Sequence, residues 1–360
     1  WLSAGTAFYQ KGAPGSFYAP GPYNGIRTQK GGRITERTGI LPLFGGLALF
    51  LFGMDRMSEA LQQAAGERLR RALAALTRTP LTGALAGMVV TAVMQSSSAT
   101  TVMVIGFVSA GLLELPQAVA VIFGANIGTT VTAQLLAFRV EELLGLVLFG
   151  GFFLCAVART KRGRQMGTAV FSFGLLFAGM EQIQSVVEPL ALRPEFEAWM
   201  AQVREKPLWG LLLGLGMTLV VQSSSATIGV LQGVARQAGP DGVHSLLGLA
   251  GAVPVLLGDN VGTTITAILA AAGGTRDAKR AAAAHCCFNL SGSLVCLLAL
   301  PWFVRLVELL PPEGEELEII ARQIANAHTL FNALCTLIWL PLTPLMVRLV
   351  TTLVPEKRTE

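Results

Sequence analysis

Two short runs of hydrogen-bonding side chains interrupt apolar stretches of the sequence. Each run is a glutamine followed by three serines: Gln95, Ser96, Ser97 and Ser98 in the first, and Gln222, Ser223, Ser224 and Ser225 in the second. Serine hydroxyls rotate toward an acceptor, and a helix that begins at such a run presents free backbone N–H groups and about half a positive charge. We therefore predict that the two runs bind one tetrahedral oxyanion from opposite sides.

Oxygen-bearing side chains around these runs suit sodium, for which we extend the ligand preferences of other hard cations. A threonine follows each run, and a Gly-x-Asn-x-Gly-Thr-Thr segment comes later in each half. The candidate sodium ligands are Gln95, Thr100, Asn126, Thr129, Thr130, Gln222, Thr227, Asp259, Asn260, Thr263 and Thr264. Neither run contains Arg or Lys. Bound cations would therefore have to offset the charge of the anion, which favours coupled transport of cation and anion.

The duplication of both motifs is the strongest signal in the chain. Paired interruptions at corresponding places in two halves of a membrane protein point to the binding site of a transporter. A single Ser and Thr run would more simply be explained as hydrogen bonding between membrane helices. Asp259 stands where the first copy has Ala125, and an ionisable group at membrane depth needs a partner. A sodium ion shared with Asn260 is the partner we favour. The alternatives are a proton, a cation such as Arg280, and solvation of the carboxylate in a water-filled vestibule.

Two other repeated features admit a structural interpretation. Gly124, Gly128, Gly258 and Gly262 either permit an unwound backbone whose carbonyls face the ions or form small faces for close helix packing. A His-x-x-Phe-Asn pattern occurs twice, and its polar members are His285, Asn289, His328 and Asn332. We interpret these as residues of helix contacts rather than as ligands.

The elements that position these residues must lie in a bilayer. Hydrophobic residues make up 52% of the chain, charged residues only 14%, and the mean hydropathy is +0.58, whereas charged residues account for about 25% of a soluble domain. The formal net charge of +5 comes from short basic clusters between apolar runs, which excludes a nucleic-acid partner and indicates membrane topology. The five cysteines show no metal-binding spacing.

A membrane helix needs about 20 apolar residues, and seven stretches qualify: 40–57, 115–138, 142–158, 166–186, 245–272, 281–303 and 325–352. Two further apolar regions, 80–113 and 207–238, are divided by the glutamine runs and fit re-entrant helical hairpins. The expected fold is an all-α integral membrane protein with two inverted repeats, each with one such hairpin and one broken transmembrane helix.

This pattern divides the chain into an irregular N-terminal arm, two transporter repeats and the segments that join them. The expected parts are the arm 1–39, repeat 1 at 40–158 (hairpin about 80–113, broken helix about 115–138), a cytoplasmic basic linker 159–165, the inverted repeat 2 at 166–303 (hairpin about 207–238, broken helix about 245–272), an extracytoplasmic loop 304–324, and a last transmembrane helix with its tail 325–360.

Basic residues are expected on the cytoplasmic side of a membrane. The linker with Arg159, Lys161, Arg162 and Arg164 is the clearest basic cluster, so we place it inside, and the C-terminus is then also cytoplasmic. The acidic segment around Glu315 falls outside. We expect a multi-pass protein of the cell inner (plasma) membrane, in contact with the lipid bilayer and able to form a homodimer.

The glutamine runs, the Gly-x-Asn-x-Gly-Thr-Thr segments and the His-x-x-Phe-Asn helix resemble those of the sodium-phosphate cotransporters, the type II phosphate symporters and their bacterial relatives, over about residues 40 to 350. The resemblance implies sodium-driven uptake of inorganic phosphate, with sodium ions co-transported and with alternating access by an elevator-like or rocking movement. Many bacterial relatives carry a domain resembling the phosphate-signalling protein PhoU, and we expect any such regulator to act in trans.

Two alternatives come from other classes. The cargo of the same carrier could be another oxyanion or a small carboxylate. An intramembrane serine hydrolase would use a serine of either run and His285 or His328 as base. It would explain one serine but not the duplication, and the sequence has no Gly-x-Ser-x-Gly motif.

Overall fold

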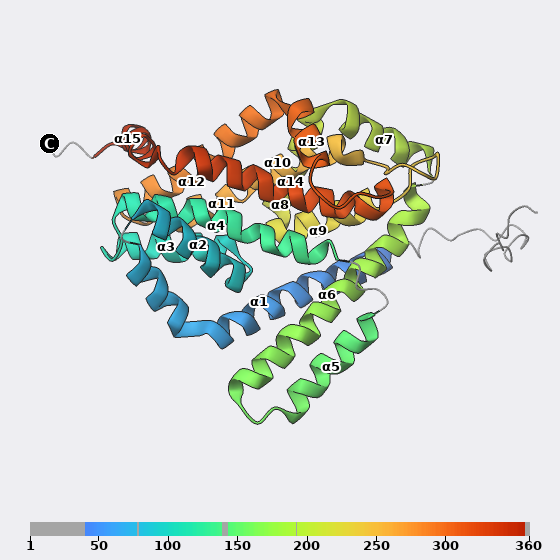
Figure 1. The fold of residues 1–360 in the computed structure, drawn as a ribbon, viewed down its shortest axis with the longest axis horizontal. Helices are drawn as coiled ribbons and strands as arrows, with labels where there is room; N and C mark the ends of the chain where they lie inside the picture. The colour runs from blue at the N-terminus through green and yellow to red at the C-terminus, as the bar shows by residue number, and fades with distance from the viewer. Residues whose placement is uncertain (1–39, 78, 139–142, 192, 357–360) are drawn as a thin grey trace, which may run out of the picture. The chain divides into compact units, whose positions relative to one another are not determined.

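The computed structural model describes residues 40–77, 79–138, 143–191 and 193–356, and almost all of them are helical (Figure 1). The expected N-terminal arm lies outside the described residues. The helices are α1 Ile40–Leu76, α2 Pro80–Met94, α3 Ser97–Ser109, α4 Leu115–Leu136, α5 Leu144–Val157, α6 Lys161–Ala191, α7 Pro194–Glu205, α8 Pro207–Val221, α9 Ser224–Ala235, α10 Gly248–Gly262, α11 Thr264–Ala271, α12 Arg276–Leu298, α13 Leu300–Glu308, α14 Glu316–Trp339 and α15 Thr343–Leu353. The all-α expectation is confirmed.

Capping residues set the start of the helices that carry the polar runs. Thr79 accepts a hydrogen bond from the backbone N–H of Thr82, and Pro80 occupies the first position of α2, where the missing proline N–H has no helical partner to lose. Pro207 has the same place in α8. α2 contacts α3, and α8 contacts α9. We call α2–α3 the first helix pair and α8–α9 the second helix pair.

Each helix pair packs closely on one long helix of its own repeat, α2 on α4 and α8 on α10. Glycines allow the approach. A Cβ atom on Gly87 would overlap the carbonyl oxygen of Val121, and one on Gly214 would overlap the carbonyl oxygen of Val255. Glycines at these positions bring the helix backbones into direct contact, as small residues do between membrane helices.

The core consists of two clusters of buried apolar side chains. The larger one joins α3, α4, α9, α10, α12 and α14, and within it the rings of Phe123 and Phe288 stack with their centroids 4.9 Å apart. The smaller cluster lies mainly between α1 and α6 and includes Phe50 and Leu176. α5 lies beside α6 (Figure 1). Gly151 is buried, and the other residues of α5 are half-buried or exposed.

The sequence predicts a break in each of two long helices. That prediction is wrong for the first copy, and the second copy has only a slight interruption. α4 is continuous through Gly124 and Gly128. α10 stops at Gly262 and α11 begins at Thr264, with helical dihedral angles at the residue between them. The backbone is therefore not unwound. A Cβ atom on Gly124 or on Gly258 would overlap a carbonyl oxygen of the adjoining helix, so close packing explains these glycines.

Several predicted boundaries also differ from the structure. Part of the expected loop 304–324 is helical, in α13 and the start of α14. The expected last span is bent by 87° between α14 and α15, because Pro341 and Pro344 follow one another closely there. The expected linker 159–165 is mostly the first turn of α6. α7 was not predicted.

Fewer helices qualify as membrane spans than the seven that the sequence predicts. Within the described residues, four helices are long and apolar enough to cross a membrane, and a fifth qualifies if the bent pair α14–α15 counts as one span. They are Leu115–Leu136, Lys161–Ala191, Gly248–Ala271 and Arg276–Leu298. α5, which covers the expected span 142–158, has only 14 residues. These helices suit a multi-pass membrane protein.

Candidate substrate and cation site

Both glutamine runs form the same sharp break between two helices. Gln95 ends α2 and Gln222 ends α8, and both have the left-handed backbone conformation, with φ of 56° and 54°. This conformation is uncommon for a residue with a side chain and is the usual way for a helix to stop. We call Gln95–Ser96 the first break and Gln222–Ser223 the second break.

A serine starts the next helix at each break. Ser96 accepts a hydrogen bond from the N–H of Ala99 at 3.1 Å, and Ser223 accepts one from Ala226 at 3.3 Å. The sequence folds this way because a serine N-cap satisfies one of the unpaired N–H groups of the first helical turn. The other N–H groups of that turn have no partner within the helix, so each break can donate hydrogen bonds to an anion.

Residues of α4 and α11, one helix from each repeat, contact the first run. Thr132 of α4 donates a hydrogen bond to Oε1 of Gln95 at 2.9 Å, and the Gln95 amide donates to the carbonyl of Ala92. The hydroxyls of Thr266 in α11 and Ser98 lie 3.2 Å apart, and Thr266 also lies 2.9 Å from the carbonyl of Thr263. Gln95 is buried. The glutamine of the first break is thus buried and hydrogen-bonded, and residues of both repeats contact the first run.

The second break has the same backbone but different surroundings. Gln222 is exposed, Ser223 and Ser224 are half-buried, and Ser225 is buried. Within the described residues, no hydrogen bond joins the first break to the second. The prediction that the two breaks hold one anion from opposite sides therefore stays a prediction.

Next to each break, a threonine of the preceding helix contacts a threonine of the following helix. Thr91 donates to Thr100 at 2.9 Å in the first copy, and Thr218 lies 3.1 Å from Thr227 in the second. In the second copy a carboxylate joins them, because Thr218 also lies 2.6 Å from Oδ1 of Asp259. Asp259 is fully buried, and within the described residues its Oδ2 has no hydrogen-bond partner.

The asparagines of the repeated segments meet the His-x-x-Phe-Asn helices. Oδ1 of Asn126 lies 3.2 Å from Nε2 of His285, and Asn332 donates to Oδ1 of Asn260 at 3.4 Å. The amide of Asn126 donates to the carbonyl of Ile122, so its Oδ1 is the acceptor and His285 must donate from Nε2. The expectation that both histidines lie at helix contacts holds for His285.

Several buried acceptors near these contacts have no donor among the described residues. They are Oδ2 of Asp259, Oδ1 of Asn289, Oδ1 of Asn332 and Nδ1 of His285. Leaving such an atom without a partner costs about 1 to 3 kcal/mol. A cation or a water molecule would supply what they lack, so this region suits a positive ion better than an anion.

The threonines that end the repeated segments are turned toward their own helices. Each donates to a backbone carbonyl three or four residues earlier, at 2.7 to 3.2 Å, and they are Thr129, Thr130, Thr263 and Thr264. Their hydroxyl lone pairs stay available to a cation. All four side chains are buried.

A model of the Na+/Pi-cotransporter family matches residues 49–185 and 187–331 of the chain, which together make up more than half of its length and contain both breaks. The chain belongs to the Na+/Pi-cotransporter family. It is therefore a membrane transport protein and not an enzyme, which excludes the serine hydrolase.

Proteins from bacteria and animals are similar to this chain. The uncharacterized protein YqeW of Bacillus subtilis is 34% identical over 275 residues, which cover 76% of this chain and 87% of YqeW. YjbB of Escherichia coli, provisionally named as an inorganic phosphate export protein, is 28% identical over 258 residues, which cover 72% of this chain and 46% of YjbB. Sodium-dependent phosphate transport protein 2A of Rattus norvegicus is 38% identical over 97 residues, which cover 26% of this chain and 15% of that protein. No solved structure matches the chain.

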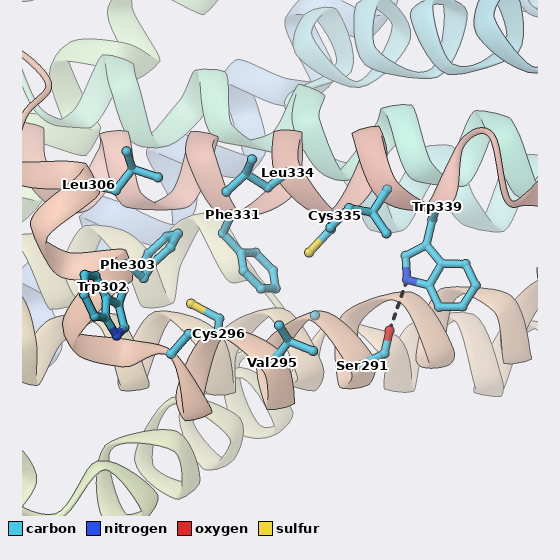
Figure 2. A pocket seen from close by; sticks show the side chains of 13 residues that line it. Ser291, Val295, Cys296, Trp302, Phe303, Leu306, Phe331, Leu334, Cys335 and Trp339 are labelled. Atoms are coloured by element: carbon cyan, nitrogen blue, oxygen red, sulfur yellow. Dashed lines mark hydrogen bonds between the residues drawn. The ribbon is translucent and has the colours of Figure 1, made fainter.

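An apolar slot of about 370 Å³ between α12, α13 and α14 does not fit a phosphate ion (Figure 2). Its walls include Cys296, Phe331 and Cys335, and the indole of Trp339 donates to Ser291 at one end. A desolvated phosphate would find almost no donor there, and burying a charge without partners is very costly. The two breaks offer more hydrogen-bond donors than this slot.

Four threonines near the breaks were not among the predicted site residues: Thr91, Thr132, Thr218 and Thr266. A longer alignment of the two copies would have found them. Thr91 and Thr218 each lie four residues before the glutamine of a run, and Thr132 and Thr266 each lie two residues after a Thr-Thr pair.

Proposed function

We propose that the chain couples sodium ions to the movement of inorganic phosphate across the membrane, with phosphate bound at the two breaks and moved by alternating access. The observation that carries the proposal is the duplicated break, in which a glutamine ends one helix and a serine caps the next. Membership of the Na+/Pi-cotransporter family supports phosphate as cargo.

The chemistry of the breaks supports an oxyanion. The serine hydroxyls and the N–H groups at the start of α3 and α9 are donors, and the positive ends of both helix dipoles lie there. Arg and Lys are absent from both breaks. The negative charge of phosphate therefore requires bound cations, and the buried acceptors around Asp259 and Asn332 are suitable ligands.

The direction of net transport depends on the gradients. One relative is named for phosphate export and another for sodium-dependent phosphate transport. We propose symport, in which a large inward sodium gradient drives phosphate uptake and a large outward phosphate gradient drives release. The same protein would then perform phosphate uptake or phosphate release.

The decisive experiment is isotope flux in proteoliposomes that contain the purified protein. Radioactive phosphate uptake should rise with an inward sodium gradient and vanish when potassium replaces sodium. Phosphate loaded inside should leave faster when sodium is also inside. Excess sulfate, arsenate and small carboxylates, added as competitors, test the other cargoes. If phosphate flux does not depend on sodium in either direction, the coupling of phosphate to sodium is contradicted.

Substitutions of Asp259 should weaken the response to sodium. Asp259→Ala removes a buried carboxylate whose Oδ2 has no partner in the described residues, and we expect the sodium concentration for half-maximal uptake to rise about tenfold or more. Asp259→Asn keeps an oxygen ligand without the charge and should give a smaller rise. If both variants keep the sodium dependence and the transported charge of the parent, Asp259 is not part of the coupling site.

Membrane topology can be tested at two exposed residues, Arg162 at the start of α6 and Glu315 before α14. In a variant without native cysteines, a cysteine at Glu315 should react with an impermeant thiol reagent added outside intact cells, and one at Arg162 should not, because basic segments stay in the cytoplasm. Reversed labelling would invert the orientation, and equal labelling would contradict an odd number of crossings between the two residues.

A further inference from the structure

The two copies differ in one buried group behind otherwise matching breaks. In the second copy, Thr218 lies 2.6 Å from Oδ1 of Asp259, 3.1 Å from the hydroxyl of Thr227 and 3.0 Å from the carbonyl of Gly214. In the first copy the residue in the place of Asp259 is Ala125. α8 and α9, which carry Thr218 and Thr227, have no charged side chain in their helical residues.

A hydroxyl group has only one hydrogen to donate. Thr218 therefore donates to one of its three neighbours at a time, and an ionised carboxylate is the strongest acceptor among them. Thr227 lies 3.3 Å from the carbonyl of Ser223, and it can donate either there or to Thr218. While Thr218 donates to Thr227, the carbonyl of Ser223 is the acceptor left to Thr227. While Thr218 donates to Asp259, its oxygen becomes a second acceptor for Thr227. The contact between Thr218 and Asp259 therefore decides whether Thr227 has an acceptor besides the carbonyl of Ser223 at the second break.

The first copy has the same chain of hydroxyls without the carboxylate. Thr91 donates to Thr100, and Thr100 lies 3.1 Å from the carbonyl of Ser96. Ala125 offers no competing acceptor. The hydroxyls behind the first break consequently have one favoured direction, whatever the ion content of the second copy.

We propose that Thr218 is the positioning residue that couples cation binding at Asp259 to the shape of the second break. The proposal rests on the proposed function. A sodium ion on the unpartnered Oδ2 holds the carboxylate of Asp259 against Thr218, so that Thr218 donates to Asp259 and its oxygen accepts from Thr227, which releases the carbonyl of Ser223. Sodium then prepares the second break for phosphate, and the first break responds to phosphate without this switch.

The first test compares substitutions of Thr218 by sodium titration of phosphate uptake in proteoliposomes. Thr218→Val keeps the shape and removes the hydroxyl. We expect it to raise the sodium concentration for half-maximal uptake about tenfold or more, the effect of losing a charge-assisted hydrogen bond. Thr218→Ser should restore the parental value to within about twofold. Thr218→Cys, a weaker donor, should fall between them. A merely structural role would lower the amount of active protein without this shift.

Double-mutant cycles identify the route of the coupling. If Thr218 acts through Asp259, Thr218→Val should have almost no further effect on the sodium titration in an Asp259→Ala background. Thr91→Val is the matched control from the first copy, and its effect should add to that of Asp259→Ala. The phosphate KM at saturating sodium should change less than the sodium constant in the Thr218→Val protein.

A binding measurement separates this proposal from the proposed function. Sodium alone should raise the melting temperature of the parent and of the Thr218→Ser protein in detergent, and should raise that of Thr218→Val only at higher concentration. Additive effects in the Thr218–Asp259 cycle, or a parental sodium constant in Thr218→Val, would overturn the coupling while sodium-driven flux of the parent still stands. A parent that shows neither sodium-driven flux nor stabilisation by sodium would overturn both.

Discussion

Gly214→Ala is expected to disrupt the contact between α8 and α10, whereas Gly216→Ala, in the same helix, is expected to leave the protein at least as stable as the parent. The added methyl at Gly214 would overlap the carbonyl oxygen of Val255, and at Gly216 nothing lies within 4 Å. Overpacking costs about 1 to 3 kcal/mol or more. Both changes gain about 1 kcal/mol in helix propensity, so their difference isolates the packing.

Thermal unfolding in detergent, followed by size-exclusion chromatography, measures this difference. We expect a clearly lower melting temperature and reduced phosphate flux for Gly214→Ala, since the second break lies at the end of the displaced helix. Gly87 is the corresponding residue of α2, and its Cβ would overlap the carbonyl oxygen of Val121, so Gly87→Ala should behave in the same way. Equal melting temperatures for Gly214→Ala and Gly216→Ala would show that the helices do not approach as described.

Ser96→Ala and Ser223→Ala are each expected to reduce phosphate transport strongly in protein that is still folded and inserted. Each substitution removes an N-cap, which costs about 1 kcal/mol of stability. It also removes a donor to the anion, for which we expect about 1 to 3 kcal/mol, or roughly a 5- to 100-fold loss of apparent phosphate affinity. Substitution of Gln95 or Gln222 by alanine should have effects of similar size on transport.

The control is another N-cap of the first helix pair. Thr79 caps α2 at its start, far along the helix from the first break, and its side chain accepts from Thr82. Thr79→Ala should cost similar stability and leave the phosphate KM unchanged. Full uptake by the Ser96 and Ser223 variants, measured per folded protein, would show that phosphate does not bind at the breaks.

The sequence predicted the local structure of the breaks better than that of the long helices. A polar run inside an apolar stretch has few outcomes in a membrane, because unpaired backbone groups must have partners, and both runs do end one helix and cap the next. Gly124 and Gly258 were harder to interpret. Glycine permits both an unwound backbone and close packing, and only the position of the carbonyl oxygens across the helix contact decides between them.

Tertiary contacts explain most of what the sequence could not predict. Thr132 and Gln95 are distant in the sequence, and their hydrogen bond follows from the way α2 lies on α4. The bend between α14 and α15 interrupts the last predicted span, which qualifies only if the two helices are counted together, although the apolar residues continue through it. Hydropathy measures the length of apolar sequence and contains no information on the direction of the chain.

Gln95 is buried and bound by Thr132, whereas Gln222, with the same backbone conformation, is exposed. Under the alternating access proposed above, these two near-identical segments would exchange environments during the transport cycle. Exchanging the roles of the copies would give a second conformation in which Thr266 binds Gln222 as Thr132 now binds Gln95. Cysteines at Gln222 and Thr266 should form a disulfide only as that exchange occurs, and failure to trap it during phosphate flux would restrict the protein to the arrangement described.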